Sequence, residues 1–504
     1  MRLEVKKNAK RNIMVGLINN TVVLILPFVT RSIINSLLGS MYLGMNSLFS
    51  SILTVLSLSE MGLSGAMVYH MYKPIADGDV SRINALLALY KKAYRIIGLA
   101  IIGMGVCLVP FLHLLIKGAV LTGVNVYVIY LIELFSTSLS YLLFAYRSSM
   151  LAAHQRVDVT TITNLFISVG LKITQIIVLL VTKNYYLYVI VTPVFTVLNN
   201  VWIAYITKKM YPQYKPEGRL DRETLSSIKK LVAGTFIQKA CVTTRNSLDS
   251  IFISVFLGLT LTGIYNNYYT IFSAVLGLMA IISNALSGGI GNHVALKSVD
   301  ENFEELKQLD FLYMTIAGVC TSCLLCLYQP FMRIWMGGDM LLDFPSVVLL
   351  CVYFYTLKMG DMKAMYASAN GLWWKMRYRA IIETITNILL NIILGATFGV
   401  NGIIIATTVS LFVCNFIWGS IINFNSYFGP GKLVVFFKYH FIGALKTVVF
   451  CGISYSINLA VDIGNPYFDL ICKTFIAIVI PLLLYFVTSC KTELFRKSIK
   501  MVKK

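Results

Sequence analysis

The chain has 504 residues, of which 57% are hydrophobic and only 13% are charged, and its formal net charge is +21. Soluble proteins carry about a quarter charged residues, whereas here apolar runs of about 20 residues, long enough to cross a bilayer, recur from end to end. These figures exclude a soluble enzyme, a secreted disulfide scaffold and a disordered chain. They predict an all-α, polytopic integral membrane protein.

The apolar runs predict fourteen transmembrane helices. We expect them at residues 12–37, 42–70, 93–116, 123–146, 158–182, 185–207, 229–257, 262–292, 309–332, 345–369, 378–398, 401–424, 434–459 and 468–490.

The distribution of Lys and Arg predicts the orientation of these helices. With the N-terminus in the cytosol, 31 of the 43 Lys and Arg residues fall in cytosolic segments and four in outer loops. Cytosolic loops of membrane proteins are enriched in Lys and Arg. We therefore expect both termini in the cytosol, and the positive charge needs no nucleic acid as a partner.

Two segments of the sequence can be aligned at a constant offset of 219 residues. Leu38 and Gly39 then meet Leu257 and Gly258, and Gly44 meets Gly263. The aligned segments belong to the first two and to the seventh and eighth predicted helices, six crossings apart, so the copies share one orientation. Duplicated halves around a central cavity are typical of transporters.

The repeat predicts a domain organisation with two pseudo-symmetric bundles. We expect an N-terminal six-helix bundle at residues 1–207, a basic cytoplasmic connector at 208–228, a second six-helix bundle at 229–424, two additional helices at 425–490 and a basic cytoplasmic tail at 491–504.

Thirteen ionisable residues lie inside the predicted helices, and eight of them are cations. Eight cations facing lipid would cost on the order of 20 kcal/mol, so most are expected to face protein or water. The excess of positive charge predicts a cavity suited to an anion. The residues are Arg31, Glu60, Arg95, Glu133, Lys172, Lys239, Arg245, Asp249, Lys358, Asp361, Lys363, Glu383 and Lys446.

Five of these residues are candidates for substrate binding. Arg31 follows Pro27 by four residues, at a place where a helix can kink. Arg245 and Asp249 share one helical face, where they could bind substrate or form a private salt bridge. Lys239 lies about 240° around the same helix from Arg245. Glu60 could contact a substrate or ion, or join two helices by a hydrogen bond.

Energy coupling and cofactors can be addressed from motifs. Glu60, Asp249, Asp361 and Glu383 are candidates for H⁺ or Na⁺ coupling. The P-loop motif GxxxxGK[ST] is absent from the sequence, which excludes ATP binding of that kind. No pattern predicts a metal site or a cofactor.

The opening of the chain resembles a known family. The segments KNAKRNIMVGLINN, TRSIINSLLGSMYLGMNSLFSSILTVLSLSEMGLSGAMVYHMYKPIADGD and ALLALYKKAYRIIG are similar to the start of Wzx-type polysaccharide repeat-unit flippases. The likeness extends more loosely to TTRNSLDSIFISVFLG and to the fourteen-helix plan. This family belongs to the multidrug/oligosaccharidyl-lipid/polysaccharide exporter superfamily, together with the lipid II flippase and the multidrug extruders.

The resemblance implies a non-enzymatic transporter in the bacterial cytoplasmic membrane. It would carry an undecaprenyl-pyrophosphate-linked oligosaccharide to the outer leaflet for O-antigen, capsule or exopolysaccharide synthesis, by alternating access of a V-shaped pair of bundles. It implies that Arg31, Glu60, Arg245, Asp249 and Lys239 line a cationic cavity, and that the last two helices form a groove for the lipid tail. Its partners would be membrane lipids and the polymerase and chain-length regulator of the same pathway, and we expect a monomer.

Two alternative functions remain open from the sequence. The first is a multidrug or metabolite extruder of the same superfamily, although fourteen helices and a cationic excess favour the flippase. The second is a membrane-embedded polysaccharide polymerase or acyltransferase, which would need a large outer loop or a buried catalytic His.

Overall fold

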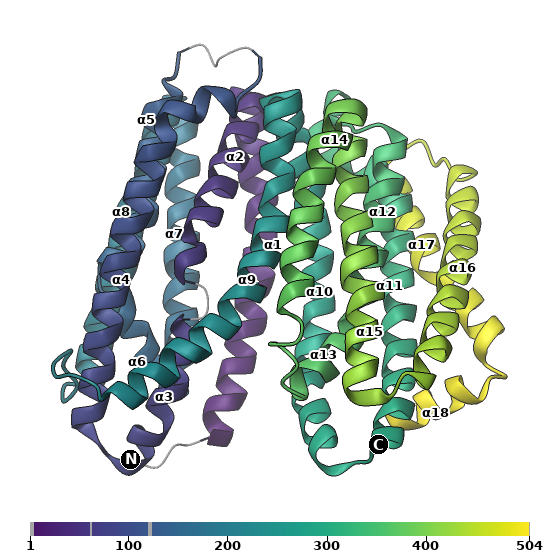
Figure 1. The fold of residues 1–504 in the computed structure, drawn as a ribbon. Coiled ribbons are helices and arrows are strands. Elements are labelled where there is room, and N and C mark those ends of the chain that lie inside the picture. The colour runs from purple at the N-terminus through teal and green to yellow at the C-terminus, as the bar shows by residue number, and fades with distance from the viewer. Residues whose placement is uncertain (1–4, 61–62, 119–122, 503–504) are drawn as a thin grey trace. The chain divides into compact units, whose positions relative to one another are not determined.

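The computed structural model describes residues 5–60, 63–118 and 123–502, which are helical with short connections and contain no strand (Figure 1). The α-helices are α1 (Val5–Leu38), α2 (Ser40–Leu56), α3 (Leu63–Asp77), α4 (Val80–Leu108), α5 (Val126–Leu142), α6 (Ser148–Ala153), α7 (Val157–Thr182), α8 (Tyr185–Met210), α9 (Arg222–Leu257), α10 (Leu259–Leu296), α11 (Val299–Met336), α12 (Phe344–Lys358), α13 (Asp361–Ala369), α14 (Arg377–Ser410), α15 (Gly419–Asn423), α16 (Gly431–Leu459), α17 (Pro466–Ser489) and α18 (Glu493–Val502). Short 3-10 turns form η1 (Ser57–Glu60), η2 (Val109–Leu114), η3 (Ala145–Arg147) and η4 (Gly338–Met340), and η5 (Leu411–Trp418) and η6 (Phe424–Phe428) are π-helical.

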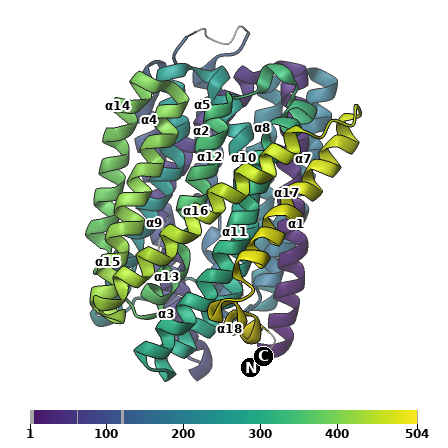
Figure 2. The same cartoon turned by 90° about the vertical axis from the view of Figure 1, so that its right-hand side faces the viewer.

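The chain divides into two compact units, Met1–Gly263 and Ile264–Lys504. In the first unit α7 packs against α1 and α8, α5 packs against α4 and α8, and α2 packs against α1 and α9. In the second unit α11 is central and packs against α12, α16, α17 and α18. Figure 2 shows α16 and α17 crossing α11. The division into bundles at 1–207 and 229–424 stays a prediction, since compactness instead keeps α9 with the first unit.

Within the described residues, nine helices are long and apolar enough to cross a membrane, or ten if the bent pair α5 and Ala145–Ala153 counts as one. The count of fourteen stays a prediction. The other predicted spans fall on elements that are short, broken or polar: α2 with η1 and α3, the charged α9, and α12 with α13.

Helix α14 contains two of the predicted spans. Gly399 has non-helical backbone angles (φ 60°, ψ −135°), and the Asn387 amide donates to the Thr407 hydroxyl at 2.9 Å across the turn. A Cβ on Gly402 would overlap the Leu394 carbonyl. The two segments therefore form a tight antiparallel helical hairpin.

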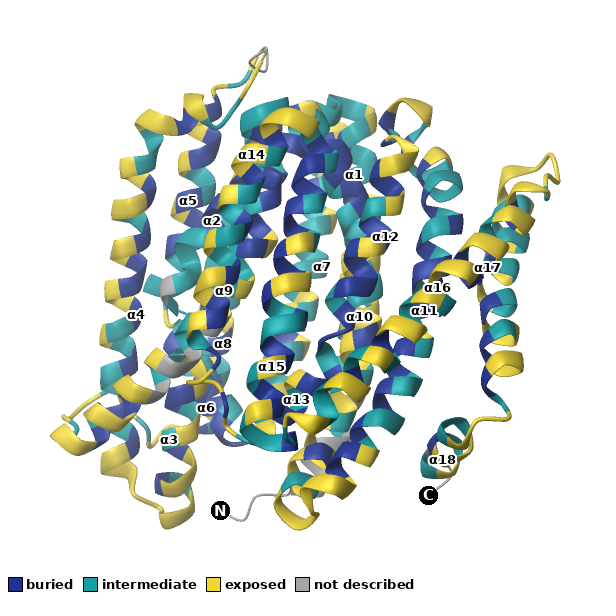
Figure 3. Cartoon of the chain, turned by 45° about the vertical axis from the view of Figure 1, so that its right-hand side comes forward, coloured by how far each residue is buried: buried dark blue, intermediate teal, exposed yellow. Residues whose placement is uncertain are grey.

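Large apolar side chains remain exposed along the helices. On α4, Ile96, Leu99 and Met104 are exposed, whereas Tyr90, Tyr94 and Ile101 are buried. Figure 3 shows the same alternation of exposed and buried stripes on α4 and α16. An apolar surface of this kind is expected where lipid, rather than water, covers the helix.

The C-terminal tail forms α18, whose apolar and charged residues lie on separate faces. Its Phe495 ring lies 6.2 Å from Phe311 and 5.8 Å from Phe486, between ring centroids. Residues 503 and 504 of the predicted basic tail lie outside the described residues.

Candidate functional site

Arg31 projects from α1 toward α2 and the start of α10. One guanidinium nitrogen donates to the Ser47 hydroxyl at 3.4 Å, and the other donates to the Gly263 carbonyl at 3.2 Å. Helix α1 continues through Pro27, and Thr30 donates to the Leu26 carbonyl at 2.7 Å in the turn that Pro27 leaves without its N–H. Arg31 therefore lies in protein contact within the first unit.

Arg245 and Asp249 are buried on α9, with 4% and 2% of their surface exposed. The helix that carries them packs against α2, which also contacts α1. Helix α2 thus adjoins both helices that carry the predicted arginines. Lys239 is exposed, on another part of the α9 surface.

Glu60 lies in η1, where the second predicted span breaks. The Tyr94 hydroxyl donates a short hydrogen bond to Glu60 Oε1, and the Tyr90 hydroxyl donates to that of Tyr94 at 2.8 Å. The ring of Tyr141 lies 5.7 Å from that of Tyr94. Tyrosines from α4 and α5 thus surround the carboxylate, and two of them form a hydrogen-bonded chain that ends on it.

A similar arrangement occurs in the second unit. Tyr313, which is 219 residues after Tyr94, donates to Asp361 Oδ2 at 2.5 Å. Lys358 pairs with the same oxygen at 2.7 Å, and Ser283 donates to the Tyr313 hydroxyl at 3.3 Å. Glu60 and Asp361 therefore both lie at helix breaks and accept from repeat-related tyrosines.

Glu383, the remaining candidate for ion coupling, is paired with Arg379. The two atoms Nη1 and Oε2 are 2.7 Å apart, one helical turn separates the residues, and both are buried. Breaking a buried pair of this kind leaves an uncompensated charge.

The structure also shows a polar cluster that sequence reasoning did not assemble. Lys172 of α7 donates to Gln175 Oε1 at 3.1 Å, and the Gln175 amide donates to the Tyr188 carbonyl at 3.2 Å on α8. Glu133 of α5 interacts electrostatically with Lys172, and Tyr188 with Arg31. Charged residues within apolar runs were the only signal, because pairing depends on how α5, α7 and α8 are rotated.

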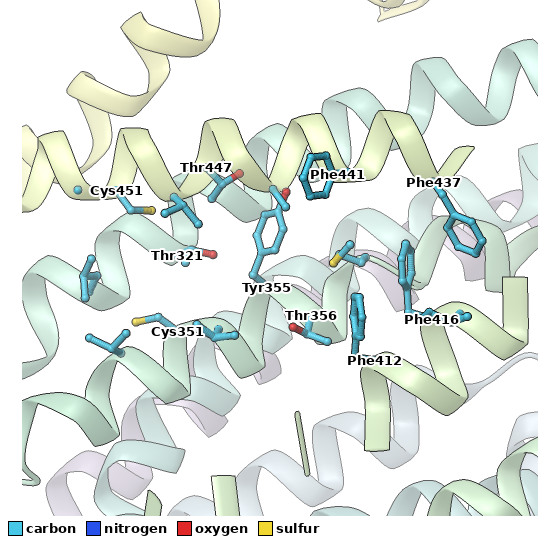
Figure 4. Close-up of a pocket in the computed structure, with 18 residues that line it drawn as sticks. Thr321, Cys351, Tyr355, Thr356, Phe412, Phe416, Phe437, Phe441, Thr447 and Cys451 are labelled. Carbon is cyan, nitrogen blue, oxygen red and sulfur yellow. The ribbon is translucent and has the colours of Figure 1, made fainter. Parts of the chain in front are cut away.

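An apolar groove lies in the second unit, with a volume of about 640 Å³. Helices α11, α12, α16 and η5 line it (Figure 4). Tyr355 and Cys351 come from α12, Thr447 and Cys451 from α16, and Phe416 from η5. The side chains that enclose it are mainly aliphatic and aromatic, so the groove is suited to an apolar chain.

No family model matches the chain, and no curated protein sequence matches it. Solved structures do. The chain is similar to a lipid II flippase, MurJ, in an inward closed conformation, with a TM-score of 0.70 and 16% identity over 94% of this chain and 98% of that one. It is also similar to an inward-facing multidrug resistance MATE family transporter of the MOP superfamily, with a TM-score of 0.60 and 15% identity over 84% and 99% of the two chains. A MOP superfamily transporter from Pyrococcus furiosus matches with a TM-score of 0.53 and 14% identity over 85% and 96%.

These similarities establish the fold. The chain has the all-helical fold of MOP superfamily transporters, as the sequence analysis predicts. The solved neighbours are transporters and flippases of membranes, and the many apolar helices of this chain agree with a multi-pass membrane protein.

Proposed function

We propose that this protein is a flippase for a lipid-linked oligosaccharide, an undecaprenyl-pyrophosphate-linked repeat unit that moves from the inner to the outer leaflet of the bacterial cytoplasmic membrane. The observation that carries the proposal is the apolar groove of about 640 Å³, present in a chain whose fold is that of a lipid II flippase. The groove is suited to the polyprenyl tail, which cannot enter a polar cavity without a loss of hydrophobic stabilisation.

The pyrophosphate would bind in the first unit. A guanidinium group can hold phosphate oxygens by bidentate, charge-assisted hydrogen bonds. Arg31 and Arg245 belong to helices that adjoin α2, and Glu60 and Asp249 lie in the same unit. In this proposal the two arginines bind the anion, while Lys239, which is exposed, serves at the entrance.

The multidrug extruder is the alternative that the comparisons keep open, because multidrug transporters share the fold. Two observations favour the flippase. The multidrug transporter covers 84% of this chain although 99% of its own length is matched, whereas the lipid II flippase covers 94%. The long apolar groove also suits a lipid chain better than a small organic cation.

Several parts of the proposal concern the cellular setting. Transport is proposed to occur in a monomer without ATP or a bound cofactor, with H⁺ or Na⁺ coupling through one of the acidic residues. Both termini are proposed to be cytosolic. The polymerase and chain-length regulator of the same pathway would use the translocated unit.

A deletion in the native strain, followed by extraction and mass analysis of polyprenyl-linked sugars, tests this function. We expect complete repeat units to accumulate on the cytosolic leaflet while surface polymer is lost, and the wild-type gene should restore the polymer. Normal surface polymer together with altered drug sensitivity would support the extruder. Units exposed outside but not polymerised would support an enzyme.

A further inference from the structure

Two buried ionisable residues lie side by side in the second unit, outside the candidate sites above. His440 of α16 and Asp310 of α11 are 2% and 1% exposed, and Nε2 lies 3.1 Å from Asp310 Oδ2. The contact is close enough for an ion pair but is misaligned for a hydrogen bond. Among the described residues, neither carboxylate oxygen of Asp310 accepts a hydrogen bond.

A buried carboxylate without hydrogen-bond donors is costly. An unpaired polar group in an apolar environment costs roughly 2–7 kcal/mol, and an isolated ion costs more. The cost falls when the imidazole takes up a proton, because the pair then carries no net charge. Binding of one proton is thus the simplest way to satisfy Asp310 and His440 together.

The groups around the pair come from each of the packed helices. Lys363 of α13, Tyr355 of α12, Tyr313 of α11 and Tyr439 of α16 interact electrostatically with Asp310. Beyond Lys363 lies the buried Arg379–Glu383 pair of α14.

Lys363 already has partners that hold its charge. Its ammonium group donates to the carbonyls of Asn415 and Phe416 at 2.7 and 2.8 Å, and to the Ser420 hydroxyl at 2.9 Å. Asn415 and Phe416 lie in the π-helical η5, and π-helical turns often occur at functional sites. Since backbone oxygens hold Lys363, it is less available to neutralise Asp310.

The pair borders the apolar groove. His440 lies on α16 between Phe437 and Phe441, both of which line the groove. The ring centroid of Phe416, which also lines it, is 5.0 Å from that of His440. One aromatic ring therefore separates the imidazole from whatever fills the groove.

We propose that Asp310 and His440 form a proton-binding site whose occupancy is coupled to that of the apolar groove. In the empty state water can reach the wall of the groove, and the ionised Asp310 is tolerated beside a neutral imidazole. An apolar chain removes that water, so an uncompensated negative charge becomes more costly. The imidazole then accepts a proton from solvent through Nε2, and chain and proton bind cooperatively.

The experiment uses the full-length protein in detergent and a polyprenol as the probe, because this uncharged isoprenoid alcohol does not itself titrate in the range studied. We expect its affinity to rise about tenfold as the pH falls from about 8 to about 6, with uptake of protons on binding. D310N and H440Q should abolish both effects. H113Q, which removes an exposed histidine in η2, should retain them.

Each outcome decides the proposal. An affinity that is the same at every pH, or a pH dependence that survives in H440Q, overturns it. If both variants unfold, the absence of proton uptake by the unmutated protein still overturns it. The inference rests on the proposed function only for the occupant of the groove. Polyprenol binding without proton uptake therefore leaves the flippase proposal intact, whereas absence of polyprenol binding contradicts both.

Discussion

Gly44 and Gly263 are reciprocal partners in one helix crossing. A Cβ on Gly44 would overlap the backbone carbonyl of Leu259, and a Cβ on Gly263 would lie 2.5 Å from the carbonyl oxygen of Ser40. Each pair of positions, Ser40 with Leu259 and Gly44 with Gly263, is 219 residues apart. The sequence repeat is thus also a repeat of contacts, in which each copy meets the other's backbone.

Substitution of either glycine by alanine should destabilise the protein. The clash is with backbone, which cannot move aside as a flexible side chain can, and overpacking of this kind costs about 1–3 kcal/mol. Thermal melting of the detergent-solubilised protein measures the effect. Gly103→Ala on α4 is the matched control, because nothing lies within 4 Å of its added methyl group. Equal melting temperatures for all three variants would contradict the close crossing.

Removal of either buried cation should abolish transport without loss of protein. We expect Arg31→Ala and Arg245→Ala to reduce surface polysaccharide by at least about tenfold, or ~1.4 kcal/mol, while the amount of protein in the membrane stays unchanged. Arg95→Ala, which changes an exposed arginine on α4, should have little effect. If the alanine variants retain activity, the proposed binding of an anion by these arginines is wrong.

Filling the groove should block the substrate. Ala444 lines the groove on α16, whereas the exposed Ile442 of the same helix does not. We expect Ala444→Trp to reduce surface polymer by about tenfold and Ile442→Trp to leave it near the wild-type level. Complementation of the deletion strain, with protein level measured by immunoblot, distinguishes the two. Equal activity would show that the groove does not receive a required part of the substrate.

The predicted orientation can be tested by labelling. Gln213 lies in the basic connector and is exposed, and Lys183 lies in the exposed turn between α7 and α8. We expect an impermeant thiol reagent to label Lys183→Cys in intact cells, and Gln213→Cys only after permeabilisation. The unmutated protein provides the background from its ten cysteines. Labelling of Gln213→Cys from outside would invert the topology.

The first turn of α9 should depend on pH. Asp221 accepts from the Thr224 N–H at 2.7 Å, and this hydrogen bond at the helix N-terminus lowers the pKa of the Asp221 carboxyl group. The lowered pKa means that its stabilisation is present above the usual pKa of aspartate and is lost as pH falls through the lowered value. We expect the Thr224 amide to exchange faster in Asp221→Ala but not in Asp221→Asn. Hydrogen exchange measured by mass spectrometry checks this, and unchanged exchange in Asp221→Ala would contradict the cap.

The sequence predicted the class of fold and several local features, because these depend on one segment at a time. Gly39 and Gly258, aligned by the repeat, both separate two helices at a positive φ, of 93° and 90°. The burial of Arg245 with Asp249, away from Lys239, follows from helical spacing alone.

Pairs between distant helices could not be predicted in the same way. Glu133 and Lys172 were recognised only as separate charges, and Asp310 with His440 gave no signal, because these residues are 130 positions apart. Their meeting depends on the rotation and depth of α11 and α16, which hydrophobic runs leave open.

The π-helical turns in η5 and η6 constrain the length of the chain in this region. Each π-turn holds one more residue than an α-turn, so deletion of a single residue from Leu411–Trp418 would restore α-geometry and rotate everything that follows by about 100°. Asn423, whose amide donates to the Lys363 carbonyl at 2.8 Å, would then face away from α13. Homologues should therefore tolerate substitutions in this stretch far better than insertions or deletions, so that its residue number is inherited more strictly than its composition.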